Sequence, residues 1–177
     1  MNNIYKKICC KALVFILIFG VIISLVDLHT DGILIRDGNY YIRPANSTTY
    51  QVNVIGALQV PGTLVESRRV IDGANQTFVI TNIEGNQYAL MYGNAGMCIA
   101  VASDKETVVA QDFDVNNDYN KWEITRLGTS QSLLFTNVAT GNSLYYEYSN
   151  ELKTNQMKVK EYDGSDRKFE FIVVKYA

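Results

Sequence analysis

The sequence predicts an all-β domain that is built from three repeats of about 45 residues and preceded by an apolar N-terminal segment. Short runs of alternating apolar and polar residues are separated by turn signals such as Asp37-Gly38 and Asp163-Gly164. No segment after residue 37 shows a sustained period of 3.6. The chain has twelve Tyr and only two Pro, a composition that favours strands.

A polar string that ends in a large aromatic residue recurs late in each repeat. The three strings are Gln76-Thr77-Phe78, Asn120-Lys121-Trp122 and Arg167-Lys168-Phe169, with the aromatic residues 44 and 47 positions apart. A second apolar residue follows each aromatic two positions later, so both side chains face the same side of a strand. We therefore expect Phe78, Trp122 and Phe169 to be core residues, one for each repeat. The repeats are predicted over 37–81, 82–126 and 127–174, and three such units can close a barrel with threefold pseudosymmetry.

The N-terminal segment has the pattern of a targeting signal. Lys6, Lys7 and Lys11 precede an uncharged run from Ala12 to Val26, as in a positive n-region followed by an apolar h-region. We expect a helix at residues 1–26 that is either a cleaved signal peptide or a retained signal-anchor in a membrane. A connector would follow at 27–36 and the β domain at 37–177. The domain is therefore expected outside the cytoplasm, secreted or at the cell surface.

Charge and histidine content exclude several classes of function. The formal net charge is −2 and no stripe of basic residues is present, so a nucleic acid partner is not expected. The only histidine, His29, lies in the connector, so the domain cannot form a Ser-His-Asp or Cys-His catalytic site. We expect a domain that is not an enzyme and needs no cofactor.

Two features could indicate a metal site or a disulfide. Oxygen-bearing side chains between Asp112 and Glu123 have the spacing of a calcium loop, but Asn117 stands where the sharp turn needs Gly. The loop is therefore predicted to be solvated and free of metal. Cys98 is the only cysteine of the domain, because Cys9 and Cys10 precede it. It is predicted to be a small buried hydrophobe, with intermolecular pairing as the alternative.

Several of these strings resemble a ricin-type β-trefoil lectin domain. That family repeats a polar-x-Trp string and has a Gly-x-Cys-Leu-Asp-Val-like strand in the middle of each repeat. The matching strings here are Ala74-Asn75-Gln76-Thr77-Phe78, Gly96-Met97-Cys98-Ile99-Ala100-Val101, Asn120-Lys121-Trp122, Gly141-Asn142-Ser143-Leu144-Tyr145-Tyr146 and Arg167-Lys168-Phe169. The resemblance covers residues 37–174, and it implies a β-trefoil fold and a glycan or glycoprotein as ligand.

The departures from the family restrict where a sugar could bind. Gln51, Ala100 and Tyr145 are predicted to stand at the position of the family's sugar-contacting Asp, and only the first repeat keeps the Asn75-Gln76 pair. The resemblance therefore implies a carbohydrate site at Gln51, Asn75 and Gln76, in which Gln76 holds the loop and Asn75 faces the ligand. The alternative is a trefoil that has lost sugar binding and serves as a protein-interaction or structural surface domain.

Overall fold

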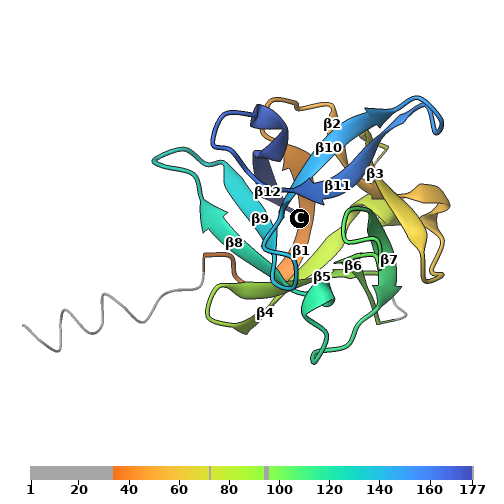
Figure 1. The fold of residues 1–177 in the computed structure, drawn as a ribbon, viewed down its shortest axis with the longest axis horizontal. Helices are drawn as coiled ribbons and strands as arrows, with labels where there is room; N and C mark the ends of the chain where they lie inside the picture. Colours follow the sequence, from red (N-terminus) through yellow and green to blue (C-terminus); the bar gives the residue numbers. More distant parts are fainter. Residues whose placement is uncertain (1–33, 72, 94–95, 177) are drawn as a thin grey trace, which may run out of the picture. The chain divides into compact units, whose positions relative to one another are not determined.

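The computed structural model describes residues 34–71, 73–93 and 96–176, and Figure 1 shows how they are arranged. This part of the chain forms twelve strands, and four of them begin in each predicted repeat. The first repeat contains β1 (Gly38–Pro44), β2 (Tyr50–Val54), β3 (Thr63–Arg69) and β4 (Phe78–Glu84). The second contains β5 (Gln87–Tyr92), β6 (Met97–Val101), β7 (Val108–Asp112) and β8 (Trp122–Arg126). The third contains β9 (Leu133–Asn137), β10 (Ser143–Ser149), β11 (Thr154–Lys160) and β12 (Phe171–Lys175).

Four single-turn 3-10 helices are the only helices in the described residues: η1 (Ile55–Ala57), η2 (Ala74–Gln76), η3 (Asp118–Asn120) and η4 (Arg167–Phe169). The prediction of an all-β fold is therefore confirmed for this part of the chain. None of these helices is long and apolar enough to cross a bilayer. The predicted signal or anchor at 1–26 lies outside the described residues.

The first and last strands of each repeat close a six-stranded antiparallel barrel. β1 pairs with β4 and β12, β5 pairs with β4 and β8, and β9 pairs with β8 and β12. Because the ring is complete, none of these six strands leaves a free edge.

The middle strands of each repeat form a hairpin, and the three hairpins are joined to one another. β2 pairs with β3, β6 with β7 and β10 with β11, while β3 also pairs with both β7 and β11. A single bridge between Thr107 and Lys158 connects β7's hairpin to β11. The threefold arrangement that the sequence repeats predict is thus present in the described residues.

One large aromatic residue at the start of each repeat's last strand fills the barrel. Phe78, Trp122 and Phe171 begin β4, β8 and β12, and each is fully buried. Trp122 also donates its indole N–H to the carbonyl of Ile99 at 2.9 Å, which satisfies its one polar atom. Phe171 packs edge-on against Phe135, with ring centroids 5.9 Å apart.

The third of the predicted aromatic strings is displaced by two residues. A 3-10 helix and one connecting residue precede each of β4, β8 and β12, which aligns Phe171, rather than Phe169, with Phe78 and Trp122. Phe169 is buried as expected, but it ends η4, at the position that Gln76 and Asn120 occupy in the other repeats. Phe169 and Phe171 are both apolar and two apart, so the period of the pattern alone could not distinguish them.

The ordered core begins slightly before the predicted domain boundary. Ile35, which falls in the predicted connector, is 6% exposed and belongs to the core cluster. Its backbone N–H donates to the hydroxyl of Tyr88 at 3.1 Å. The end of the connector therefore contributes to the packing of the domain.

Candidate functional site

Asn53 of β2 stands at the position that the resemblance assigns to sugar contact, on the face of the β2–β3 hairpin that points away from the core. The two valines that flank Asn53 belong to the core cluster, so Asn53 points to the opposite face of β2. The corresponding residues between the core positions of β6 and β10 are Ala100 and Tyr145. Asn53 therefore aligns with these two residues, and the prediction that placed Gln51 there is wrong by two positions.

Gln51 and Gln76 form a buried brace instead of a ligand contact. Both are fully buried, and the amide of Gln51 donates to Oε1 of Gln76 at 2.6 Å. The same oxygen accepts from the backbone N–H of Ile71 at 2.9 Å, and Nε2 of Gln76 donates to the carbonyl of Arg69 at 3.0 Å. Gln76 thus holds the loop before β4, and Gln51 holds Gln76, which leaves neither side chain accessible to a ligand.

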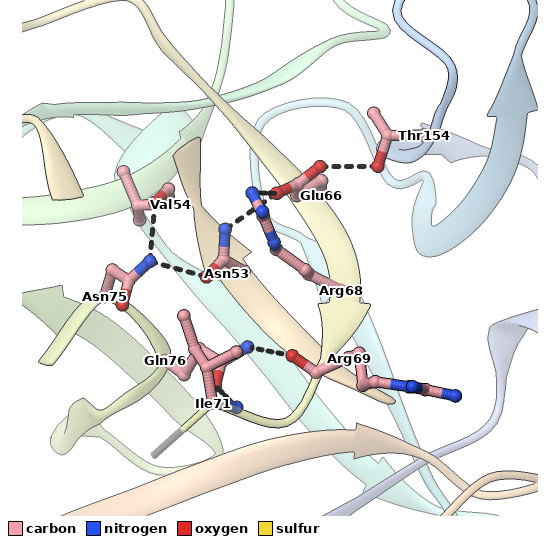
Figure 2. Close-up of polar contacts among 9 residues, drawn as sticks. All are labelled: Asn53, Val54, Glu66, Arg68, Arg69, Ile71, Asn75, Gln76 and Thr154. Atoms are coloured by element: carbon pink, nitrogen blue, oxygen red, sulfur yellow. Dashed lines mark hydrogen bonds and ion pairs between the residues drawn. The ribbon is translucent and has the colours of Figure 1, made fainter. Parts of the chain in front are cut away.

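Asn75, the third predicted site residue, is connected to a different pair of side chains. Figure 2 shows its amide directed at Asn53, with Nδ2 of Asn75 2.7 Å from Oδ1 of Asn53. Nδ2 of Asn53 in turn donates to Oε1 of Glu66 at 2.8 Å. Because a carboxylate only accepts, Glu66 fixes the orientation of the Asn53 amide, and that amide fixes Asn75. Gly73 leaves room for this arrangement, since a Cβ there would lie 2.5 Å from Oδ1 of Asn75.

Glu66 has two further partners, and one of them extends to the surface. Nη1 of Arg68 lies 3.3 Å from Oε1, and the hydroxyl of Thr154 on β11 donates to Oε2 at 2.5 Å. The Glu66 side chain is 5% exposed whereas that of Arg68 is 54% exposed. A nearly buried carboxylate is tolerated when several donors compensate it, as here. We call Asn53, Glu66, Arg68, Asn75 and Thr154 the first-repeat polar cluster.

The other two repeats have no counterpart of this cluster in the described residues. In the second repeat Ala100 faces Val109 across the hairpin, where Asn53 faces Glu66 in the first. In the third, Tyr145 stacks on Phe169 with ring centroids 5.2 Å apart and planes at 22°. An apolar and an aromatic side chain thus stand at the position of Asn53. Lys158, which faces Tyr145 across the third hairpin, pairs with Glu106 and Glu147 and continues no series like that from Asn75 to Glu66.

Cys98 is buried in β6 and unsuited to pairing with another chain. Burial, and secondarily the charge of Asp112, raises the pKa of its thiol to about 12, so the thiol stays protonated at neutral pH. This favours the prediction of a small buried hydrophobe over that of an intermolecular disulfide.

The acidic loop before β8 uses its oxygen atoms for its own turns. Asp114 accepts from the backbone N–H of Asn116 at 2.9 Å, and Asn117 accepts from that of Tyr119 at 3.1 Å. Oδ1 of Asn120 accepts from the backbone of Asp114 at 2.9 Å. Within the described ranges, no three acidic, His or Cys side chains gather in a group suited to a metal ion.

The sequence contained a signal for Asn53 but none for Thr154. Val52-Asn53-Val54 matches Ile99-Ala100-Val101 when the two core residues of each strand are superimposed. Thr154 reaches Glu66 only because β11 pairs with β3, a contact between the first and third repeats. Sequence spacing carries no information about such a contact.

Comparison with known proteins gives one family and many similar structures. The family model described as ricin-type beta-trefoil lectin domain-like matches residues 74–162, a segment that includes Asn75 and Gln76 but begins after Asn53 and Glu66. No curated protein matches the chain in sequence.

Three of the similar solved structures illustrate the fold. A designed threefold symmetric protein, ThreeFoil, has a TM-score of 0.70 at 18% identity, over 79% of this chain and 100% of its own. A Polyporus squamosus lectin bound to a human-type influenza-binding epitope, Neu5Aca2-6Galb1-4GlcNAc, has a TM-score of 0.65 at 16% identity, over 80% of this chain and 50% of its own. The C-terminal domain of an earthworm lectin, as a mutant in complex with 6'-sialyllactose, has a TM-score of 0.58 at 15% identity, over 78% of this chain and 99% of its own. At these identities the likeness concerns the fold.

Proposed function

The chain belongs to the ricin-type β-trefoil lectin-like family, and on this premise we propose that it is a carbohydrate-binding module with one saccharide site, the first-repeat polar cluster. The observation that carries the proposal is the hydrogen-bonded series from Asn75 through Asn53 to Glu66. Ala100 and Tyr145 stand at the position of Asn53 in the other two repeats, so the series is not required by the fold.

The cluster separates positioning groups from groups that contact a ligand. Asn53 is fully buried and Glu66 nearly so, and their hydrogen bonds fix them in place. Asn75 is half-buried and Arg68 is exposed, so these two present polar atoms to solvent. An oriented amide and a guanidinium are the kinds of group that hold saccharide hydroxyls, and their fixed geometry lowers the entropy cost of binding.

The expected affinity for one sugar is low. Few direct contacts are available, so a dissociation constant in the millimolar range is expected, about −4 kcal/mol. Loss of one neutral hydrogen bond costs about 0.5–1.5 kcal/mol, so Asn75→Ala should weaken binding several-fold.

A glycan array identifies the saccharide, and titration of that saccharide then tests the site. The protein is made without glycosylation, because Asn75-Gln76-Thr77 is a sequon whose glycan would cover the cluster. Asn116→Ala is the matched control, since it removes an amide from an exposed loop of the second repeat. Weaker binding by Asn75→Ala but not by Asn116→Ala supports the site. Equal binding by all three proteins would place the saccharide elsewhere, and no binding by any of them would remove the proposal.

A second candidate function is a protein-interaction or structural domain without sugar binding. It is favoured by the side chains that stand at the position of Asn53 in the other two repeats. These are Ala100 in the second repeat and Tyr145, which stacks on Phe169, in the third. An array without signal, together with capture of one defined protein partner, would favour this alternative.

We further propose that the module acts outside the cytoplasm and is not an enzyme. Three lysines followed by an uncharged run at 12–26 support the first statement, and the position of His29 before the domain supports the second. Protease added to intact cells should then digest the domain, or the domain should appear in the medium. Full protection of a cell-retained domain would contradict this location.

A further inference from the structure

A groove of about 430 Å³ runs beside the first-repeat polar cluster, between β3 and the β10–β11 hairpin. Glu66, Arg68 and Thr154 of the cluster line one part of it. The rest of its wall includes Arg69 of β3 and Lys153 of the turn between β10 and β11. The groove therefore joins the first repeat to the third.

Three cations line this groove against one carboxylate. Arg68, Arg69 and Lys153 are all exposed, whereas Glu66 is nearly buried and accepts from three side chains. The groove is thus a positive region on a chain whose net charge is −2. A hollow lined by charges of one sign focuses their field and attracts anions more strongly than the same charges on a flat surface.

Two exposed tyrosines add aromatic surface to the same groove. Tyr50 is 38% exposed and Tyr148 is 55% exposed, and both line it. Exposed aromatic rings can cover the apolar face of a sugar ring while their hydroxyls remain in water. Cations beside aromatic faces suit a ligand that is both a saccharide and an anion.

We propose that this groove binds the acidic group of a saccharide, a carboxylate or a sulfate, while the adjoining neutral sugar contacts Asn75 in the polar cluster. The inference rests on the proposed saccharide site and adds its ligand class. Arg68 belongs both to the polar cluster and to the lining of the groove, and Arg69 and Lys153 provide the remaining positive charge. Guanidinium groups are well matched to carboxylate and sulfate because their N–H groups form a planar fork.

Two substitutions remove positive charge with little effect on the fold. Lys153 has a φ of 56°, a left-handed conformation that favours glycine, so Lys153→Gly is expected to fold normally. Lys105 has a φ of 63° in the turn of the second repeat's hairpin and does not line the groove, so Lys105→Gly is its matched control. Arg69→Gln keeps the backbone carbonyl that Gln76 uses.

The experiment applies the full chain to an array in which each neutral glycan stands beside its sialylated and its sulfated form. The best acidic glycan and its neutral parent are then titrated, with inorganic sulfate and free sialic acid as separate arms. The acidic form should bind at least fivefold more tightly than its parent at low salt, and the advantage should shrink at 0.5 M NaCl. Lys153→Gly and Arg69→Gln should each reduce the advantage about three- to fivefold and leave the neutral parent unaffected. Lys105→Gly should change neither.

Each outcome separates this inference from the saccharide site itself. Equal affinity for the neutral and acidic forms would overturn the proposed role of the groove but leave the saccharide site in place. The same holds if the double variant Lys153→Gly with Arg69→Gln still binds the acidic form more tightly than the neutral form by the wild-type factor. Tight binding of inorganic sulfate or free sialic acid with no added affinity from the attached sugar would also overturn it, as a simple anion site. Absence of all saccharide binding would overturn both.

Discussion

Removal of the Asn53 side chain should destabilise the domain more than its small size indicates. Asn53→Ala breaks two hydrogen bonds, the one at 2.7 Å from Asn75 and the one at 2.8 Å to the Glu66 carboxylate. A neutral bond contributes about 0.5–1.5 kcal/mol and a bond to a charged group about 1.5–3 kcal/mol. Glu66 keeps Arg68 and Thr154 as partners, so we expect the free energy of unfolding to fall by about 2–4 kcal/mol.

The second repeat shows which further substitution should offset the loss of stability in Asn53→Ala. Ala100 faces Val109 there, so Asn53→Ala combined with Glu66→Val gives the first repeat the same apolar pair. Replacing both partners of a buried polar contact is much less costly than replacing one. The double variant should therefore be more stable than Asn53→Ala, with a coupling energy above about 1 kcal/mol in a double-mutant cycle.

Urea unfolding followed by fluorescence measures all four proteins of the cycle. The chain has a single tryptophan, Trp122, and it is fully buried, so its emission reports on the barrel. A cost below about 0.5 kcal/mol for Asn53→Ala, or a double variant less stable than both single variants, would refute the reasoning that this cluster is a coupled, buried unit.

The remaining predictions concern the core and the thiol. Trp122→Ala should lower the free energy of unfolding by about 3–5 kcal/mol in urea unfolding followed by circular dichroism, and a cost below 1 kcal/mol would contradict the barrel-filling role. Cys98 should not react with a thiol reagent in the folded protein at pH 7, and rapid labelling would show that β6 opens. The pKa of Cys98 is raised to about 12 in the fold from 9.0, so its contribution to stability is fully present below pH 9 and is lost as the pH rises toward 12. Wild type should therefore lose more stability than Cys98→Ala over that range, and parallel pH profiles would contradict the shift. Residues 34–177 alone, which keep Ile35 in the core, should give a far-UV spectrum typical of β structure, and a spectrum dominated by helix would contradict the all-β fold.

Repetition made the architecture predictable from the sequence. Phe78 and Trp122 stand after similar polar strings at a fixed spacing, and both are barrel residues at the start of a strand. The alignment of the third repeat is ambiguous in the sequence because Phe169 and Phe171 satisfy the same alternation. A pattern of period two defines a face of a strand, but it does not define where along the strand the pattern begins.

The candidate site was only partly predictable for a related reason. The string 74–78 predicts Asn75 as a site residue, but Gln51 and Asn53 lie on the same face of one strand, two residues apart, and the alternation alone does not distinguish them. Glu66 and Thr154 enter through strand pairing within and between repeats, so their roles depend on tertiary contacts. Side-chain hydrogen bonds between residues 88 positions apart leave no periodic trace in a sequence.

Nuclear magnetic resonance of the protein with the array-selected saccharide tests the central claim most directly, because it locates the ligand without a substitution. The side-chain signals of Asn75 and Arg68 should shift as saccharide is added, and both should give the same dissociation constant. The amide signals of Asn120 and Asn137, which are buried in the other two repeats, should stay in place. Shifts confined to the second or third repeat, with the signals of Asn75 and Arg68 unchanged at saturation, would contradict a saccharide site in the first repeat.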